Sequence, residues 1–239
     1  MKTILVTAST PVEISFLIRE TGAIERMVKG IPAIHEWQVS GKRVILAITG
    51  MGKVNAASCA ASLICAFSPD ILINTGCAGA YGGSGLSVGD LAIASSEIYG
   101  DEGVLTPSGW QPLDFIGIPL AEESGERYFN EIPLSISLRN KALQFAQTLS
   151  IPLRTGKFVT VSTCSGTAAR GAELSDRFGA VCENMEGAAV AHVALRHGLD
   201  CMEIRGVSNM VEDRDLSRWD IAGAAEQAQR FILAFIETL

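Results

Sequence analysis

Short runs of apolar, β-branched residues alternate along the chain with longer segments whose apolar residues recur at helical spacing. The short runs predict strands at 3–7, 43–49, 70–75, 90–98, 157–162 and 202–208. The longer segments predict helices at 11–20, 53–66, 135–149, 166–178, 185–197 and 220–238. Strands separated by helices are typical of a sheet that is covered on both faces and contains many parallel strands. The pattern therefore predicts an α/β fold.

The stretch from about 100 to 133 shows neither pattern. It carries Gly, Pro, Trp and Phe close together in DEGVLTPSGWQPLDFIGIP. We expect an ordered loop with its own apolar anchors, because long loops in compact proteins often cover a ligand or contact a partner subunit.

Composition narrows the ligand class. With 239 residues and 48% hydrophobic content, residues 1–239 can form one domain with a full core. The net charge of −7 argues against nucleic acid or an anionic membrane surface as partner, and it favours a small molecule. The chain has no apolar run of membrane-spanning length, so we expect a cytoplasmic protein. Six scattered cysteines and three histidines indicate reduced thiols rather than a zinc site or a disulfide framework.

Polar residues that follow strands are the first candidates for a site, because ligands of such sheets bind where strands end. In STPVEISFL (9–17), Thr10, Pro11 and Glu13 fit a helix start with a capping box. Alternatively, Glu13 is a general base that acts on a water molecule.

Two glycine-rich segments follow later strands, TGMGKVNAA (49–57) and INTGCAGAYGGSG (73–85). Their backbone amides can approach an anion or a sugar closely, although both segments also fit simple tight turns. Neither is a dinucleotide fingerprint or a P-loop.

A fourth motif, ENMEGAAVAHVA (183–194), places Glu186 in the first turn of a helix made of small and apolar residues. This carboxylate either complements the helix dipole or, if buried, requires hydrogen-bond donors. The vicinal hydroxyls of a ribose would satisfy both of its oxygens.

These motifs, followed by RGVSN at 205–209, resemble the nucleoside phosphorylase and nucleosidase family over nearly the whole chain. Family members carry E-E-E-V, S-G-I-G-K-V, N-T-G-S-A-G, V-E-M-E and R-A-I-S-D in this order, where this chain has PVEI, TGMGKV, NTGCAG, ENME and RGVSN. The resemblance implies a nucleoside phosphorylase-like, three-layer αβα fold with a twisted, mixed central sheet. We expect neither a cofactor nor a metal ion at the site.

The resemblance also implies roles for individual residues. The expected catalytic residues are Glu13, Arg205 and Asn209, and the expected substrate-binding residues are Met51, Cys77, Gly79, Met185, Glu186, Ser208 and Trp219. Glu13 would activate the attacking water near Arg205, and Glu186 would bind the ribose hydroxyls. Trp219 would lie against the 5′ substituent. The segment 158–164 would flank the base, in a register that the sequence does not fix.

The nucleophile is predicted to be water. Phosphorylases of this family bind phosphate with arginines in the loop after the first strand and near the glycine-rich segments, whereas TASTPVEI and NTGCAGAYGGSG contain no basic residue. Lys53 and Arg43 would weaken this prediction if they pointed into the site.

Asn209 stands where the family has an aspartic acid that faces N7 of the purine. An amide does not titrate in this range. Its carbonyl can accept a hydrogen bond from a protonated N7 while its NH₂ donates to a 6-oxo group, and an unpaired group there costs about 1–3 kcal/mol. The pattern predicts hypoxanthine or guanine as the base, unless Asn209 is simply a loop residue.

The segments N-M-V-E-D-R-D-x-S-R-W-D-I and D-E-G…W…F-I-G-I-P are similar to one branch of the family. That branch releases hypoxanthine from an inosine-like nucleoside whose 5′ carbon bears an aryl ketone with a carboxylate, on a route to menaquinone. Trp219, Trp110 and Phe115 would suit the aryl group, and Arg214 or Arg218 would suit the carboxylate unless both are solvated.

Three alternatives stay open: an inosine-type phosphorylase, a methylthioadenosine-type nucleosidase, and a nucleoside-binding protein without turnover. The family resemblance also implies a homodimer in which the 100–133 loop of one subunit closes the 5′ pocket of the other.

Overall fold

The computed structural model describes residues 1–29 and 31–239. The strands are β1 (Thr3–Ala8), β2 (Ile24–Arg26), β3 (Ile34–Val39), β4 (Lys42–Ile48), β5 (Ile71–Ala80), β6 (Leu91–Tyr99), β7 (Val104–Thr106), β8 (Gly109–Gln111), β9 (Ala121–Glu123), β10 (Glu126–Tyr128), β11 (Glu131–Pro133), β12 (Leu153–Thr160), β13 (Ala180–Asn184) and β14 (Asp200–Met210). The α-helices are α1 (Ser15–Thr21), α2 (Lys53–Phe67), α3 (Ile136–Thr148), α4 (Ala168–Phe178), α5 (Gly187–Arg196) and α6 (Ile221–Ile236), and 3-10 turns occupy Pro11–Glu13, Leu113–Phe115 and Leu216–Arg218.

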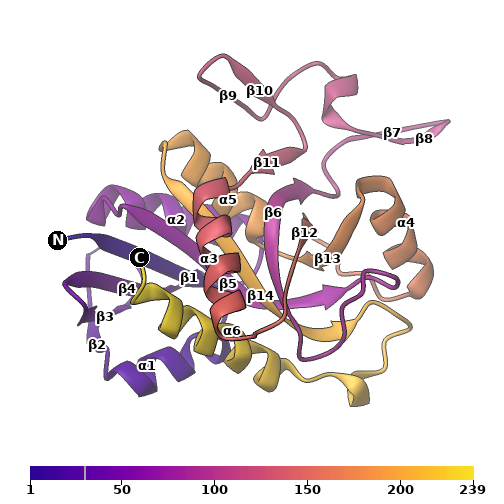
Figure 1. The fold of residues 1–239 in the computed structure, drawn as a ribbon. Coiled ribbons are helices and arrows are strands. Elements are labelled where there is room, and N and C mark those ends of the chain that lie inside the picture. The colour runs from indigo at the N-terminus through magenta and orange to yellow at the C-terminus, as the bar shows by residue number, and fades with distance from the viewer. Residues whose placement is uncertain (30) are drawn as a thin grey trace.

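A ten-stranded mixed sheet forms the centre of the molecule (Figure 1). Its order is β11-β6-β12-β13-β5-β1-β4-β3-β2, and β14 pairs with both β5 and β6. The strands β4, β1, β5 and β14 run parallel to their neighbours in this series, whereas β13 pairs antiparallel with β5 and β14 pairs antiparallel with β6. The carboxyl ends of several strands therefore meet on one side of the sheet.

Helices cover both faces of the sheet. Along β1, Ile4 and Val6 pack into an apolar cluster that includes side chains of α1, α3 and α6, whereas Leu5 belongs to a cluster with side chains of α2 and α5. This alternation follows from the two-residue period of a strand. The predicted α/β fold, with three layers and a mixed central sheet, is confirmed.

Several elements differ from the sequence prediction. The strands β2, β3 and β13 were missed because each is short or exposes alternate polar residues, which weakens the apolar signal. The predicted helix from residue 11 starts as a 3-10 turn, and α1 begins only at Ser15. The 100–133 stretch is not irregular throughout, since it contains the hairpins β7-β8 and β9-β10 and the edge strand β11. Among the described residues, no helix combines the length and apolar content that crossing a membrane requires.

Two motifs expected in loops belong to strands. Gly76, Cys77 and Gly79 lie within β5, which continues to Ala80 because β14 and β13 pair with its far end. Asn209 lies near the end of β14, where the pairing register with β5 shifts between Val207 and Asn209. Such a bulge re-aims side chains at a strand end.

Candidate active site

A cavity of about 260 Å³ opens at the carboxyl ends of β1, β4, β5, β13 and β14. All the residues predicted for the site line it, namely Glu13, Met51, Cys77, Gly79, Met185, Glu186, Arg205, Ser208, Asn209 and Trp219. The remaining lining residues are Ser9, Thr10, Ala78, Cys164, Ser165, Glu183, Asn184 and Ile221. The structure thus brings together positions from the two ends of the sequence, such as Ser9 and Ile221.

Glu13 is buried and held by donors on both of its oxygens. Oε2 accepts hydrogen bonds from the Ser9 hydroxyl at 2.7 Å and from the Thr10 amide and hydroxyl, each at 2.9 Å. Oε1 accepts a hydrogen bond from the Cys77 amide at 2.9 Å, which leaves a lone pair for a further donor such as water. A Cβ at Gly76 would lie 2.4 Å from Oε1, so only glycine allows this approach. The capping-box contact and a base role are compatible here.

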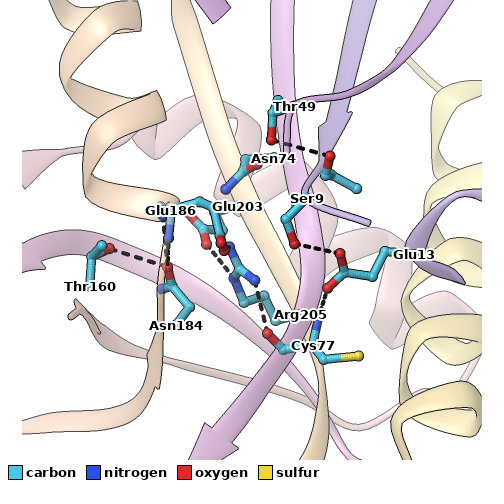
Figure 2. Close-up of polar contacts among 12 residues, drawn as sticks. Ser9, Glu13, Thr49, Asn74, Cys77, Thr160, Asn184, Glu186, Glu203 and Arg205 are labelled. Atoms are coloured by element: carbon cyan, nitrogen blue, oxygen red, sulfur yellow. Dashed lines mark hydrogen bonds and ion pairs between the residues drawn. The ribbon is translucent and has the colours of Figure 1, made fainter. Parts of the chain in front are cut away.

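Arg205 lies between the two acidic residues predicted for the site (Figure 2). Its Nε donates to Glu203 Oε1 at 2.5 Å, and its Nη1 donates to the Cys77 carbonyl at 2.8 Å. Burial alone would lower the pKa of Arg205, but the charges of Glu203, Glu186 and Glu13 outweigh it and raise that pKa. Nη2 has no hydrogen-bond partner among the described residues and lies 3.7 Å from Glu186 Oε2. A ligand oxygen between these two atoms would complete both.

Glu186 immediately precedes α5, rather than lying in its first turn as the sequence predicted. The Gly52 amide donates to its Oε1 at 2.9 Å, so the glycine-rich segment after β4 supplies a donor to the site. Asn184 Oδ1 accepts hydrogen bonds from the amides of Glu186 and Gly187 at 2.9 and 2.7 Å. Burial raises the pKa of Glu186, and Arg205 and the Gly52 amide partly offset that shift.

Ser208 and Asn209 lie together on another wall of the cavity. The Ser208 hydroxyl donates to Asn209 Oδ1 at 2.9 Å, and Asn209 Nδ2 donates to the Met210 carbonyl at 3.1 Å. Because a carbonyl can only accept, the Met210 contact fixes which end of the amide is the NH₂ group. One lone pair of Oδ1 and one N–H of Nδ2 remain for a ligand.

Of the segment 158–164, Cys164 lines the cavity, as does the adjacent Ser165, whereas Phe158 is fully buried in the core. A contact of this segment with the base stays a prediction. Glu183, a lining residue that the sequence analysis did not assign, accepts hydrogen bonds from the Ser165 amide at 2.7 Å and hydroxyl at 2.6 Å. Its signal was present in the ENME motif, where a second acid precedes Glu186 by three positions.

Trp219 lines the cavity on the side where β14 leads into α6. The Arg214 guanidinium lies over its ring, with Cζ 4.9 Å from the ring centroid, and the structure shows no ion pair for Arg214 within the described chain. Arg218, in contrast, pairs with Glu212 at 2.6 Å. The two arginines that the sequence could not separate therefore have different surroundings.

Trp110 and Phe115 do not line the cavity of their own chain. Trp110 packs edge-on against Phe178 of α4, with 5.6 Å between ring centroids. Phe115 is 64% exposed. Within one chain neither residue reaches the cavity, and a contact of these aromatic residues with the 5′ pocket of a partner subunit stays a prediction.

The basic residues that could have indicated a phosphate site point elsewhere. Lys53 forms ion pairs with Asp101 and with Glu102, and Arg43 pairs with Glu36 at 2.9 Å. Among the described residues that line the cavity, the only Lys or Arg is Arg205.

The described residues contain no cluster of three or more His, Cys, Asp or Glu side chains arranged to hold a metal ion. All six cysteines are free thiols. Burial and the charge of Glu13 raise the pKa of the Cys77 thiol to about 12, so this cavity-lining thiol is not a ready nucleophile.

Known proteins resemble this chain in sequence and in fold. Residues 3–237 match the family model of the phosphorylase superfamily. A futalosine hydrolase of Thermus thermophilus is 35% identical over 78% of this chain and 79% of its own length. A 5′-methylthioadenosine/S-adenosylhomocysteine nucleosidase of Halalkalibacterium halodurans is 33% identical over 84% of this chain and 76% of its own length. A futalosine hydrolase mutant of Helicobacter pylori has the same fold, with a TM-score of 0.86 at 24% identity over the whole of both chains. The chain belongs to the phosphorylase superfamily, within its N-ribosyl hydrolases.

Proposed function

We propose that this enzyme hydrolyses the N-glycosidic bond of a 6-oxopurine nucleoside with a bulky, anionic 5′ substituent, and that its substrate is futalosine. The products would be hypoxanthine and dehypoxanthine futalosine, on a route to menaquinone. The amide of Asn209 beside the Ser208 hydroxyl carries this proposal, because it presents one acceptor and one donor to the base.

Different side chains of the cavity would act on the ribose, the water and the base. Cleavage of the bond from C1′ to the base builds positive charge on the ribose and negative charge on the base. Glu186 Oε2 and Arg205 Nη2 would bind the ribose hydroxyls, and Glu13 Oε1 would take a proton from water as that water attacks C1′. The leaving base gains its N7 proton from solvent, since Asn209 cannot supply one.

Electrostatics favour water over phosphate as nucleophile. The cavity is lined by the carboxylates of Glu13, Glu183 and Glu186, against the single guanidinium of Arg205. Arg205 is already engaged by Glu203 at 2.5 Å. A phosphate dianion would therefore meet repulsion without a free cation to compensate for it.

The base specificity follows from the fixed orientation of the Asn209 amide. Its free lone pair can accept from a protonated N7, and its free N–H can donate to a 6-oxo group. A 6-amino group would place donor against donor, which costs about 1–3 kcal/mol in a closed pocket. Adenine nucleosides, and with them a methylthioadenosine-type function, are therefore disfavoured.

At the other end of the cavity, Trp219 offers an aromatic side chain, and Arg214 lies over its ring without lining the cavity itself. Trp219 would stack on an aryl group at the 5′ end, and the unpaired Arg214 would bind a carboxylate. Arg218 is less suited, because Glu212 already neutralises it.

The test is a product assay. Purified protein would be incubated with futalosine, inosine and 5′-methylthioadenosine, each with and without phosphate, and the free base and the sugar product would be quantified. We expect hypoxanthine from futalosine at a rate independent of phosphate. Release of ribose-1-phosphate would establish a phosphorylase, and preferential release of adenine would establish a methylthioadenosine-type nucleosidase. No release from any of the nucleosides would favour a binding protein.

We also propose that the enzyme is a homodimer in which the 100–133 region contacts the partner. Its large apolar side chains Leu105, Phe115 and Ile118 are 84%, 64% and 69% exposed. Sedimentation equilibrium should give twice the mass of the chain, and a monomer at assay concentrations would refute the proposal.

A further inference from the structure

Two fully buried acids lie behind the cavity without lining it. Glu97 on β6 and Glu203 on β14 have no exposed surface. Both approach the start of α5, because a Cβ at Gly187 would lie 2.2 Å from Glu97 Oε1 and 2.4 Å from Glu203 Oε2. The two carboxyl groups therefore face each other across a position that only glycine can occupy.

Among residues 1–29 and 31–239, one cation, Arg205, is available to this pair. Arg205 Nε donates to Glu203 Oε1, whereas Glu203 Oε2 has no hydrogen-bond partner among the described residues. The other titratable groups that sense the charge of Glu97 are Tyr99 on its own strand and the buried thiols Cys182 on β13 and Cys201 on β14. None of these can neutralise a second buried carboxylate.

The hydrogen bonds around Glu97 accommodate a neutral acid. The Thr160 hydroxyl oxygen lies 2.7 Å from Glu97 Oε2 and accepts a hydrogen bond from the Ala188 amide at 2.7 Å, and Asn184 Nδ2 donates to Glu97 Oε1 at 2.7 Å. A neutral Glu97 accepts from Asn184 through its carbonyl oxygen Oε1 and donates from Oε2 to Thr160, so its proton has an acceptor. The Thr160 hydroxyl then faces Asn184 Oδ1 at 3.2 Å.

This chain of hydrogen bonds ends at the residue predicted to bind the sugar. Asn184 Oδ1 also accepts hydrogen bonds from the amides of Glu186 and Gly187, and Thr160 accepts one from the Ala188 amide. Figure 2 shows Asn184 between Thr160 and Glu186. These are orphan amides at the start of α5, which need acceptors. Thr160 and Asn184 thus hold the backbone at the start of α5, and with it the position of Glu186.

We propose that Glu97 is a neutral carboxylic acid in the folded enzyme and a positioning residue for Glu186, acting through Thr160 and Asn184. Because a protonated Glu97 carries no charge, the positive charge of Arg205 is shared between Glu203 and Glu186. Burial and the neighbouring charge of Glu203 raise the pKa of Glu97 well above its ordinary value, in agreement with the geometry. The positioning role rests on the proposed function of Glu186, whereas the protonation state does not.

Glu97→Gln tests the protonation state through folding. A wild-type chain must take up a proton on folding wherever the pH exceeds the ordinary pKa of 4.5, and the glutamine variant need not. The stability that Glu97 contributes to the wild-type fold is therefore fully present below the pKa of the unfolded chain. It is lost as the pH rises towards the pKa of Glu97 in the folded protein. The folding constant of Glu97→Gln relative to wild type should rise about tenfold per pH unit, or about 100-fold from about pH 5 to about pH 7.

A pH-independent ratio of folding constants would overturn the proposal. Infrared spectroscopy of the wild-type protein gives a second readout that needs no variant. A protonated carboxyl stretch should persist at neutral pH, where exposed acids are ionised, and its absence would equally refute the neutral state.

The positioning role is tested by kinetics on a matched pair. Thr160→Ser keeps the hydroxyl link and Thr160→Val removes it at nearly constant volume. We expect Thr160→Ser and Glu97→Gln to stay within about threefold of wild type in kcat/KM, and Thr160→Val to lose about tenfold or more, chiefly through KM. Equal activities of the serine and valine variants would refute the positioning role. Failure of futalosine as substrate would leave the folding and infrared results unaffected.

Discussion

Exchanging Asn209 for aspartic acid should move the enzyme's preference from 6-oxopurine towards 6-aminopurine nucleosides. In the native chain Nδ2 donates to the Met210 carbonyl at 3.1 Å, and Oδ1 accepts from Ser208 at 2.9 Å. In Asn209→Asp an oxygen replaces Nδ2 opposite that carbonyl, so the carboxyl group must carry a proton between the two oxygens. The free N–H that faced the base becomes a lone pair.

The magnitude follows from the pairing. A 6-oxo group would lose its donor and meet an acceptor, whereas a 6-amino group would gain an acceptor. Each mispaired polar group in a closed pocket costs about 1–3 kcal/mol, which corresponds to about 10- to 100-fold in the ratio of kcat/KM values. The ratio for a 6-oxo over a 6-amino substrate should fall by at least about tenfold.

The assay compares substrates that differ only at the 6 position. Inosine is paired with adenosine, and 5′-methylthioinosine with 5′-methylthioadenosine, and the released base is separated by chromatography. Asn140→Asp is the matched control, because it makes the same chemical change at an exposed position of α3 outside the cavity. An unchanged ratio in Asn209→Asp, or a shift towards the 6-oxo substrate, would refute the donor and acceptor assignment.

Three further substitutions test other parts of the site. Glu13→Gln keeps the shape of the side chain but removes its basicity, so kcat should fall about 100-fold or more in a base-release assay. The melting temperature should also fall, because the new NH₂ group faces the amide donor of either Thr10 or Cys77. Gly76→Ala would place a Cβ 2.4 Å from Glu13 Oε1 at a φ of +150°. Activity and melting temperature should both fall, and the free energy of unfolding should decrease by about 1–3 kcal/mol. Gly82→Ala is its neutral control, since a Cβ there meets nothing within 4 Å. Arg214→Ala should raise KM for futalosine by about tenfold and leave KM for inosine unchanged, whereas Arg218→Ala should affect neither. Equal effects of the two arginine variants, or an effect on inosine, would refute a carboxylate contact at Arg214.

The sequence predicted the fold class and the residues that line the cavity better than it predicted the backbone conformation of those residues. Motifs at strand ends are informative because parallel strands bring their carboxyl ends together. The same motifs misled about conformation, since Cys77 and Asn209 belong to strands that extend beyond the apolar run. Their residue roles stay predictions.

The buried acids could not have been predicted as a group. Glu97 and Glu203 stand in separate apolar strands, in ASSEIY and CMEIR, and only the sheet topology places them beside α5. The sequence does show one acidic residue in each of these apolar strands, but it does not show that the two residues lie together. The contact of Trp110 with Phe178 of α4 could not be predicted from the sequence either, because it depends on how the hairpin β7-β8 packs on the rest of the chain.

The register shift in β14 divides the residues that this strand contributes to the cavity. Arg205 precedes the shift, whereas Asn209 follows it. Because the strand is held by β5 on both sides of the shift, a substitution after it need not displace Arg205. In the proposed mechanism this separation would let a single exchange at Asn209 change the preferred base while Arg205 keeps its place beside the nucleophile.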